Sequence, residues 1–72
     1  MYYATYEELS ANEVYEFGSR ERRDAWVSAA EVEEPRMPVS DEDTILFLRE
    51  CGDRGEDFDG NRIYYWGLAM PI

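Results

Sequence analysis

The chain contains no lysine, no histidine and a single cysteine, Cys51, among its 72 residues. Without histidine the commonest general base and zinc ligand are missing, and without lysine neither a Schiff base nor a P-loop can form. One cysteine fits a reducing compartment better than a secreted disulfide scaffold. No apolar run approaches the ~20 residues of a membrane span, and the first residues do not resemble a signal peptide. We therefore expect a cytoplasmic protein that is not an enzyme and uses no cofactor or metal.

Negative charge dominates the composition of the chain. Seventeen Asp and Glu stand against seven Arg, which gives a formal net charge of −10. Self-repulsion at this density opposes compaction, and about 2–8 net charges already keep a small domain in solution. The excess therefore indicates a partner with a basic surface, whereas lipid and nucleic acid are expected to repel the chain. Six Tyr, three Phe and two Trp argue against disorder, so we expect one compact acidic domain over residues 1–72.

Residue patterns predict an α+β fold: a small, mostly antiparallel sheet of about three strands with two short helices, in the order ββααβ. β-prone residues place strands at 2–6, 14–17 and 62–69. Helical spacing places helices at about 20–30 and at 41–51.

The segments between these elements are expected to be irregular. Ser19 and Ser40 are placed as the N-caps of the two helices. Residues 7–12 are predicted to form a turn, and 31–39, with two prolines, to form a connector. Residues 53–61 are predicted to form a polar loop, in which Phe58 precedes a tight turn and starts a short hairpin partner for the last strand.

Individual residues offer weaker alternatives. Cys51 falls on the apolar face of the second predicted helix, which indicates a buried structural thiol rather than a nucleophile. The acidic 53–61 loop fails the EF-hand pattern, because aligning Gly60 with the invariant glycine puts Gly55 and Trp66 at ligand positions. Arginine without lysine predicts planar ion pairs that hold acidic side chains in place.

The candidate partner-binding residues are the acidic side chains of two segments, one across the connector and one in the last loop. On an extended backbone alternate carboxylates lie ~6.6–6.8 Å apart. Successive DNA phosphates advance ~3.4 Å along the helix axis but lie farther apart through space, because the strand winds around that axis, so such carboxylates can occupy phosphate-like positions. We predict that they act as phosphate surrogates for a basic groove. The candidates are Glu31, Glu33, Glu34, Asp41, Glu42, Asp43, Asp53, Glu56, Asp57 and Asp59.

The stretch from Val14 to Val27, VYEFGSRERRDAWV, reads as a strand, a short turn and a charged helix. In this stretch, in size and in acidity, the chain resembles small anti-CRISPR proteins of phages and mobile elements. The resemblance implies an inhibitor that binds a CRISPR surveillance complex of type I and blocks the path of its target DNA. It transfers no individual site residue.

Two other readings remain open. The chain resembles other DNA mimics, such as anti-restriction proteins, in the same features. A different class of function is an interaction module that docks through the aromatic strand 62–69, with the acidic residues serving solubility alone. The two classes differ in salt dependence, since charge-based binding weakens with salt. Either protein is expected to be a monomer or a weak homodimer.

Overall fold

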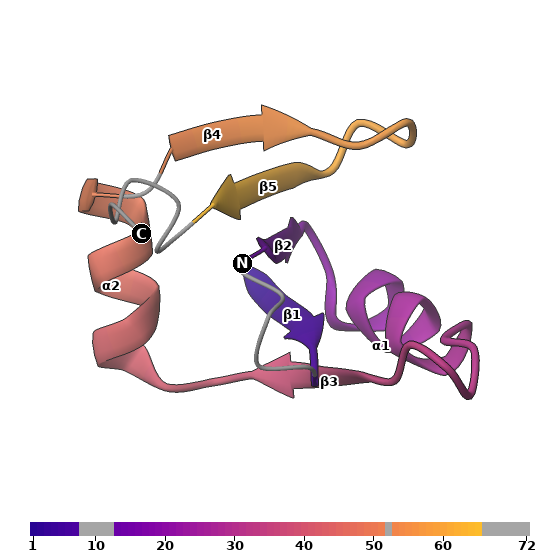
Figure 1. The fold of residues 1–72 in the computed structure, drawn as a ribbon. Helices are drawn as coiled ribbons and strands as arrows, with labels where there is room; N and C mark the ends of the chain where they lie inside the picture. The colour runs from indigo at the N-terminus through magenta and orange to yellow at the C-terminus, as the bar shows by residue number, and fades with distance from the viewer. Residues whose placement is uncertain (8–12, 52, 66–72) are drawn as a thin grey trace, which may run out of the picture.

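The computed structural model describes residues 1–7, 13–51 and 53–65. Its five strands form one antiparallel sheet in the order β3-β1-β2-β5-β4 (Figure 1). Along the chain the elements are β1 (Tyr2–Tyr6), β2 (Glu13–Phe17), α1 (Arg20–Ser28), β3 (Arg36–Val39), α2 (Glu42–Cys51), β4 (Asp53–Glu56) and β5 (Arg62–Tyr65). The α+β class and the antiparallel pairing of the first two strands are confirmed. The predicted three strands and the order ββααβ are wrong, because the order is ββαβαββ.

The two helices pack against opposite faces of this sheet. Leu48 of α2 lies fully buried against Tyr3, Val14 and Tyr64 on one face. On the other face, Trp26 and Val27 of α1 pack against a second group, formed by Ala4, Tyr15, Phe17 and Ile63. Successive strand residues point to opposite faces, so Tyr3 and Ala4 of one strand belong to different cores. The three inner strands, β1, β2 and β5, therefore each contribute to two thin apolar layers.

Both missed strands lie at the sheet edges. β3 contains Pro38, which argued for a connector, but β3 pairs only with β1 and no ladder partner needs the missing N–H on its outer side. β4 has the polar sequence DRGE and pairs only with β5. Neither edge strand shows the apolar alternation that identifies a half-buried strand. Residues 8–12 and 66–69 of the predicted turn and last strand lie outside the described residues.

The start of α1 was predicted correctly. Ser19 has an extended backbone and its Oγ accepts the Arg22 N–H at 3.2 Å, so it is the N-cap. α2 begins one residue later than predicted, because Asp41 rather than Ser40 occupies the cap. The Asp41 carboxylate accepts the Thr44 N–H at 2.9 Å, and its carbonyl accepts the Ile45 N–H at 3.0 Å.

Aromatic packing connects α1 to the sheet and to β3. The Trp26 ring centroid lies 4.5 Å from that of Tyr15 and 5.4 Å from that of Tyr6. The Arg36 guanidinium carbon lies 4.0 Å from the centroid of the same Trp26 ring. Arg36 Nη1 also donates to the Trp26 carbonyl at 2.7 Å. Arg36 thus fixes the edge strand to the helix through stacking and a hydrogen bond together.

Candidate acidic binding surface

The carboxylates are overwhelmingly on the outside. Glu13, Glu16 and Asp57 are half-buried. Twelve others among the described side chains are exposed: Glu7, Glu21, Asp24, Glu31, Glu33, Glu34, Asp41, Glu42, Asp43, Glu50, Glu56 and Asp59. The structure thus leaves eight of the predicted site residues exposed. Asp53 begins β4, and its side chain lies outside what the structure describes.

Three of the predicted residues share one tight turn between α1 and β3. The Glu34 N–H donates to the Glu31 carbonyl at 3.0 Å, which closes a four-residue turn. The far end of the loop is fixed by the Glu7 N–H, which donates to the Pro35 carbonyl at 2.9 Å. Val32, at the tip, is 98% exposed. This acidic turn, residues 31–34, presents three carboxylates on an anchored backbone.

A second group sits at the start of α2. Glu42 and Asp43 occupy the first turn, where the positive end of the helix dipole favours negative charge. The hydrogen bonds from the Thr44 hydroxyl and N–H lower the pKa of Asp41 below its usual value. Asp41 therefore stays ionised while it caps the helix, and Glu42 and Asp43 are left for a partner.

The third group belongs to the turn between β4 and β5. Asp57 holds this turn together: its Oδ1 accepts the N–H groups of Asp59 and Asn61 at 3.0 and 2.8 Å. Its Oδ2 accepts the Asn61 side-chain amide at 3.1 Å. Gly60 completes the bend with φ +81°, a conformation that costs glycine little. Asp57 is thus a structural residue of the turn, whereas Glu56 and Asp59 are available to a partner.

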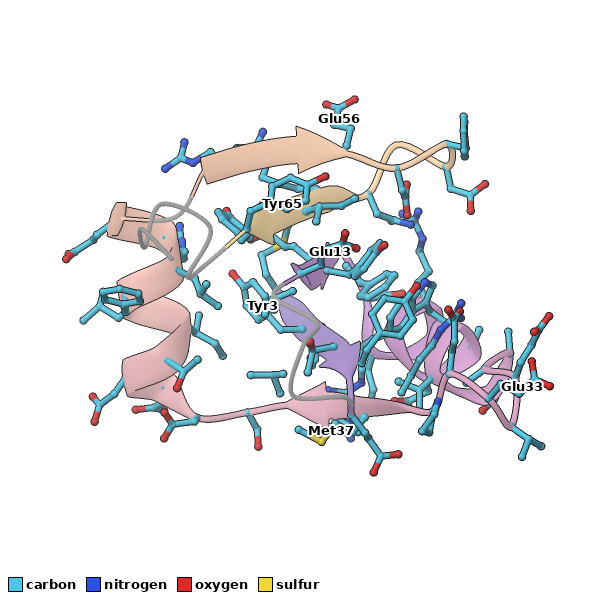
Figure 2. The ribbon with its side chains drawn as sticks, in the orientation of Figure 1. Tyr3, Glu13, Glu33, Met37, Glu56 and Tyr65 are labelled. Atoms are coloured by element: carbon cyan, nitrogen blue, oxygen red, sulfur yellow. The ribbon has the colours of Figure 1, made fainter. Side chains whose placement is uncertain are left out.

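The three groups occupy different corners of the molecule. Figure 1 shows the start of α2 on one side of the sheet, while the α1–β3 loop and the β4–β5 turn lie on the other, with α1 between them. Glu33 and Glu56 mark two of these places in Figure 2. Strand β3 (Arg36–Val39) lies between Glu34 and Asp41, and its extended backbone alone covers about 10 Å at ~3.3 Å per residue. The acidic surface is therefore a set of separated clusters, rather than one patch.

The arginines do not hold the acidic clusters, contrary to the prediction. Among the described residues one ion pair lies within 4.0 Å, between Arg23 Nε and Asp24 Oδ1 at 2.7 Å. Arg22 instead donates to the Asn61 side chain at 2.9 Å, and Arg54 donates to the Arg49 carbonyl at 2.8 Å. The exposed carboxylates are thus largely uncompensated, and their positions are set by the backbone.

Two carboxylates have a structural role that no pattern in the sequence indicated. Glu16 lies between two tyrosines, and its Oε2 accepts the hydroxyls of Tyr3 at 2.6 Å and Tyr64 at 3.2 Å. Burial and then the bond to Glu16 raise the pKa of Tyr3 above its usual value. On the other face Tyr15 donates to Glu13 Oε2 at 3.0 Å. Burial, followed by hydrogen bonds with Tyr6 and Glu13, raises the pKa of Tyr15. Tyr3 and Tyr15 therefore remain neutral donors to these carboxylates.

The aromatic strand offers little surface in its described part. β5 pairs with β2 on one side and with β4 on the other. Ile63 is 5% exposed and Tyr64 is 4% exposed. Residues 66–69 lie outside the described residues, and so does the Cys51 side chain, although Cys51 itself ends α2. Ile63 and Tyr64 belong to the two cores and are therefore not available to a partner in this structure.

Comparison with known proteins identifies no relative: no protein-family model, curated protein or solved structure matches the chain. No described helix has the length and apolar character needed to cross a membrane.

Proposed function

We propose that the chain is an inhibitor that presents DNA-like negative charge to a DNA-binding protein, and that it acts on a CRISPR surveillance complex in the cytoplasm of a bacterial host. The observation that supports this function is the set of exposed carboxylates with a single ion pair among the described residues. A surface that needed charge only for solubility could pair its seven arginines with neighbouring acids.

The charge density comes within about a factor of two of that of DNA. Ten net negative charges along the longest molecular extent of 32 Å amount to about one per 3 Å, whereas duplex DNA carries one charge per ~1.7 Å over its two strands. In Figure 1 α1 lies between the acidic turn and the β4–β5 turn, so that acidic turns stand on two sides of this helix. Each turn is positioned by hydrogen bonds to its backbone, so little backbone order has to be imposed on binding.

The first test is capture of a type I CRISPR surveillance complex by the tagged chain, at low and high salt and with competing target DNA. We expect capture that falls steeply with salt and that DNA displaces, because charge-steered association is screened by ions. Capture that survives both salt and DNA would contradict mimicry. Absence of capture would contradict the CRISPR partner and direct the search to restriction enzymes.

Paired substitutions then locate the contact. Three double variants each remove two charges: Glu33→Gln with Glu34→Gln, Glu42→Gln with Asp43→Asn, and Glu56→Gln with Asp59→Asn. Glu21→Gln with Glu50→Gln is the matched control, since it removes two exposed charges outside the three groups. Asp41 and Asp57 stay unchanged because they hold the backbone. We expect at least one double variant to weaken capture about tenfold more than the control does. Equal effects of all four would show that only net charge matters.

A further inference from the structure

Positive charge gathers at one place on this acidic molecule. An open hollow of about 410 Å³ lies where the start of β1 meets α1 and α2, and three arginines line it: Arg20, Arg23 and Arg49. Tyr2, Ser40 and Glu42 line it as well, and Met1, Val39 and Ile45 supply apolar wall. Neither the acidic groups nor the aromatic cores account for this concentration of guanidinium groups.

The arginines are positioned by the Tyr2 ring and by one carboxylate. The guanidinium carbons of Arg20 and Arg23 lie 5.8 and 5.7 Å from the Tyr2 ring centroid. Arg23 is 13% exposed and is held by its ion pair with Asp24. Arg20 and Arg49 are exposed, and neither lies within 4.0 Å of a described carboxylate. Two guanidinium forks therefore remain able to bind an anion that enters the hollow.

Placing Arg20 and Arg23 next to each other at the start of α1 is electrostatically unfavourable. Arg20 and Arg23 stand in the first turn of α1, where the helix dipole disfavours positive charge. They also repel each other around one ring. Among the acidic side chains that the structure describes, only Asp24 pairs with one of these arginines. An oxyanion bound between the guanidinium groups would offset both costs.

We propose that this hollow binds a small organic phosphate. Arginine forks match phosphate oxygens in paired, charge-assisted hydrogen bonds. The volume falls within the ~300–1,000 Å³ typical of small-molecule sites and exceeds what the phosphate group alone would fill. Val39 and Ile45 would contact the apolar remainder of the ligand. The proposal does not rest on the inhibitor function, although Glu42 belongs both to the lining of the hollow and to the second acidic group.

The net charge of the molecule does not prevent such binding. At 0.15 M salt charges beyond roughly 8 Å are largely screened, and the molecule extends over 32 Å. Asp24 balances Arg23. Among the charged side chains that line the hollow, Arg20 and Arg49 therefore set the local potential against Glu42.

The test is a titration of the whole chain with phenyl phosphate at about 0.15 M salt, followed by calorimetry and by backbone amide chemical shifts. Benzoate serves as the carboxylate counterpart. We expect saturable binding of phenyl phosphate, weaker binding of benzoate, and shifts centred on β1, α1 and the start of α2. Arg20→Gln and Arg49→Gln should each weaken binding by about tenfold, as loss of a hydrogen bond to a charged group does.

Arg62→Gln is the matched control, because Arg62 is exposed on β5, does not line the hollow and loses the same charge. We expect it to change the affinity for phenyl phosphate by less than about twofold. Two results would overturn the proposal: no saturable binding of phenyl phosphate by the unaltered chain, or an Arg62→Gln effect as large as those of the two arginines that line the hollow.

Discussion

At the scale of single residues, Asp41 is a structural carboxylate within an acidic group. It caps α2 through Thr44, and it lies beside Glu42 and Asp43 in the second acidic group. Its hydrogen bonds lower its pKa in the folded chain. A group whose pKa is lowered on folding stabilises the fold above its unfolded pKa of about 3.9, and this contribution is lost as the pH falls through the folded value.

We therefore expect Asp41→Asn to alter the acid dependence of stability more than it alters stability at neutral pH. Asparagine is also a good N-cap, so the cap survives, but it does not titrate. The thermal midpoint of the unaltered chain should fall more steeply than that of the variant from about pH 5 downwards. Asp43→Asn, with the same change of charge next to the cap, should behave like the unaltered chain. Equal slopes for all three would contradict the role assigned to Asp41.

At the scale of elements, the attachment of α2 to the sheet depends on few side chains. Leu48 is fully buried against Tyr3, Val14 and Tyr64, with Ile45 beside it. We expect Leu48→Ala to lower the free energy of unfolding by about 2–5 kcal/mol, because it leaves a cavity in a thin core. Leu46→Ala, the same change at a side chain that is 57% exposed, should cost less than about 0.5 kcal/mol. Chemical denaturation measures both changes in the free energy of unfolding. Similar losses for the two variants would contradict the packing of α2 on the sheet through Leu48.

Helices and strands were predicted correctly where a local pattern of residues is enough to specify them. Ser19 before the helical spacing of Trp26 and Val27 located α1, and β-prone residues located the first two strands. Prediction failed for β3 and β4, whose residues have no apolar alternation. Arg36 pairs across from Tyr6, and Pro38 from Ala4. These strands form because β1 and β5 offer them backbone hydrogen-bonding partners. Pairing of this kind depends on residues far apart in the sequence, so a local residue pattern does not predict it.

The sequence was enough to predict which acidic residues are exposed, but not how they are arranged in space. Exposure of Glu31, Glu33 and Glu34 follows from their chemistry. The roles of Asp41 and Asp57 in holding the backbone depend on geometry three or four residues away. The arginine-lined hollow joins residues from β1, α1 and α2, which no spacing along the chain would bring together.

At the scale of the whole molecule, the charge that would attract a basic partner also destabilises the fold. Twelve exposed carboxylates with one ion pair among the described residues repel one another over a surface only 32 Å long. Salt screens this repulsion within a Debye length of about 10 Å at 0.1 M. The same ions weaken attraction to a basic groove. Stability and binding should therefore respond to salt in opposite directions.

We expect the thermal unfolding midpoint to rise as sodium chloride increases from about 0.01 to 0.5 M, over which the Debye length falls from about 30 Å to less than 8 Å. The triple variant with Gln at positions 31, 33 and 34 should unfold at a higher temperature in low salt than the unaltered chain, because it removes three neighbouring like charges. It should also gain less from added salt. Calorimetric scans at matched pH measure both effects. A midpoint that falls with salt, or a triple variant with the same salt response as the unaltered chain, would show that repulsion at the acidic turn does not limit stability.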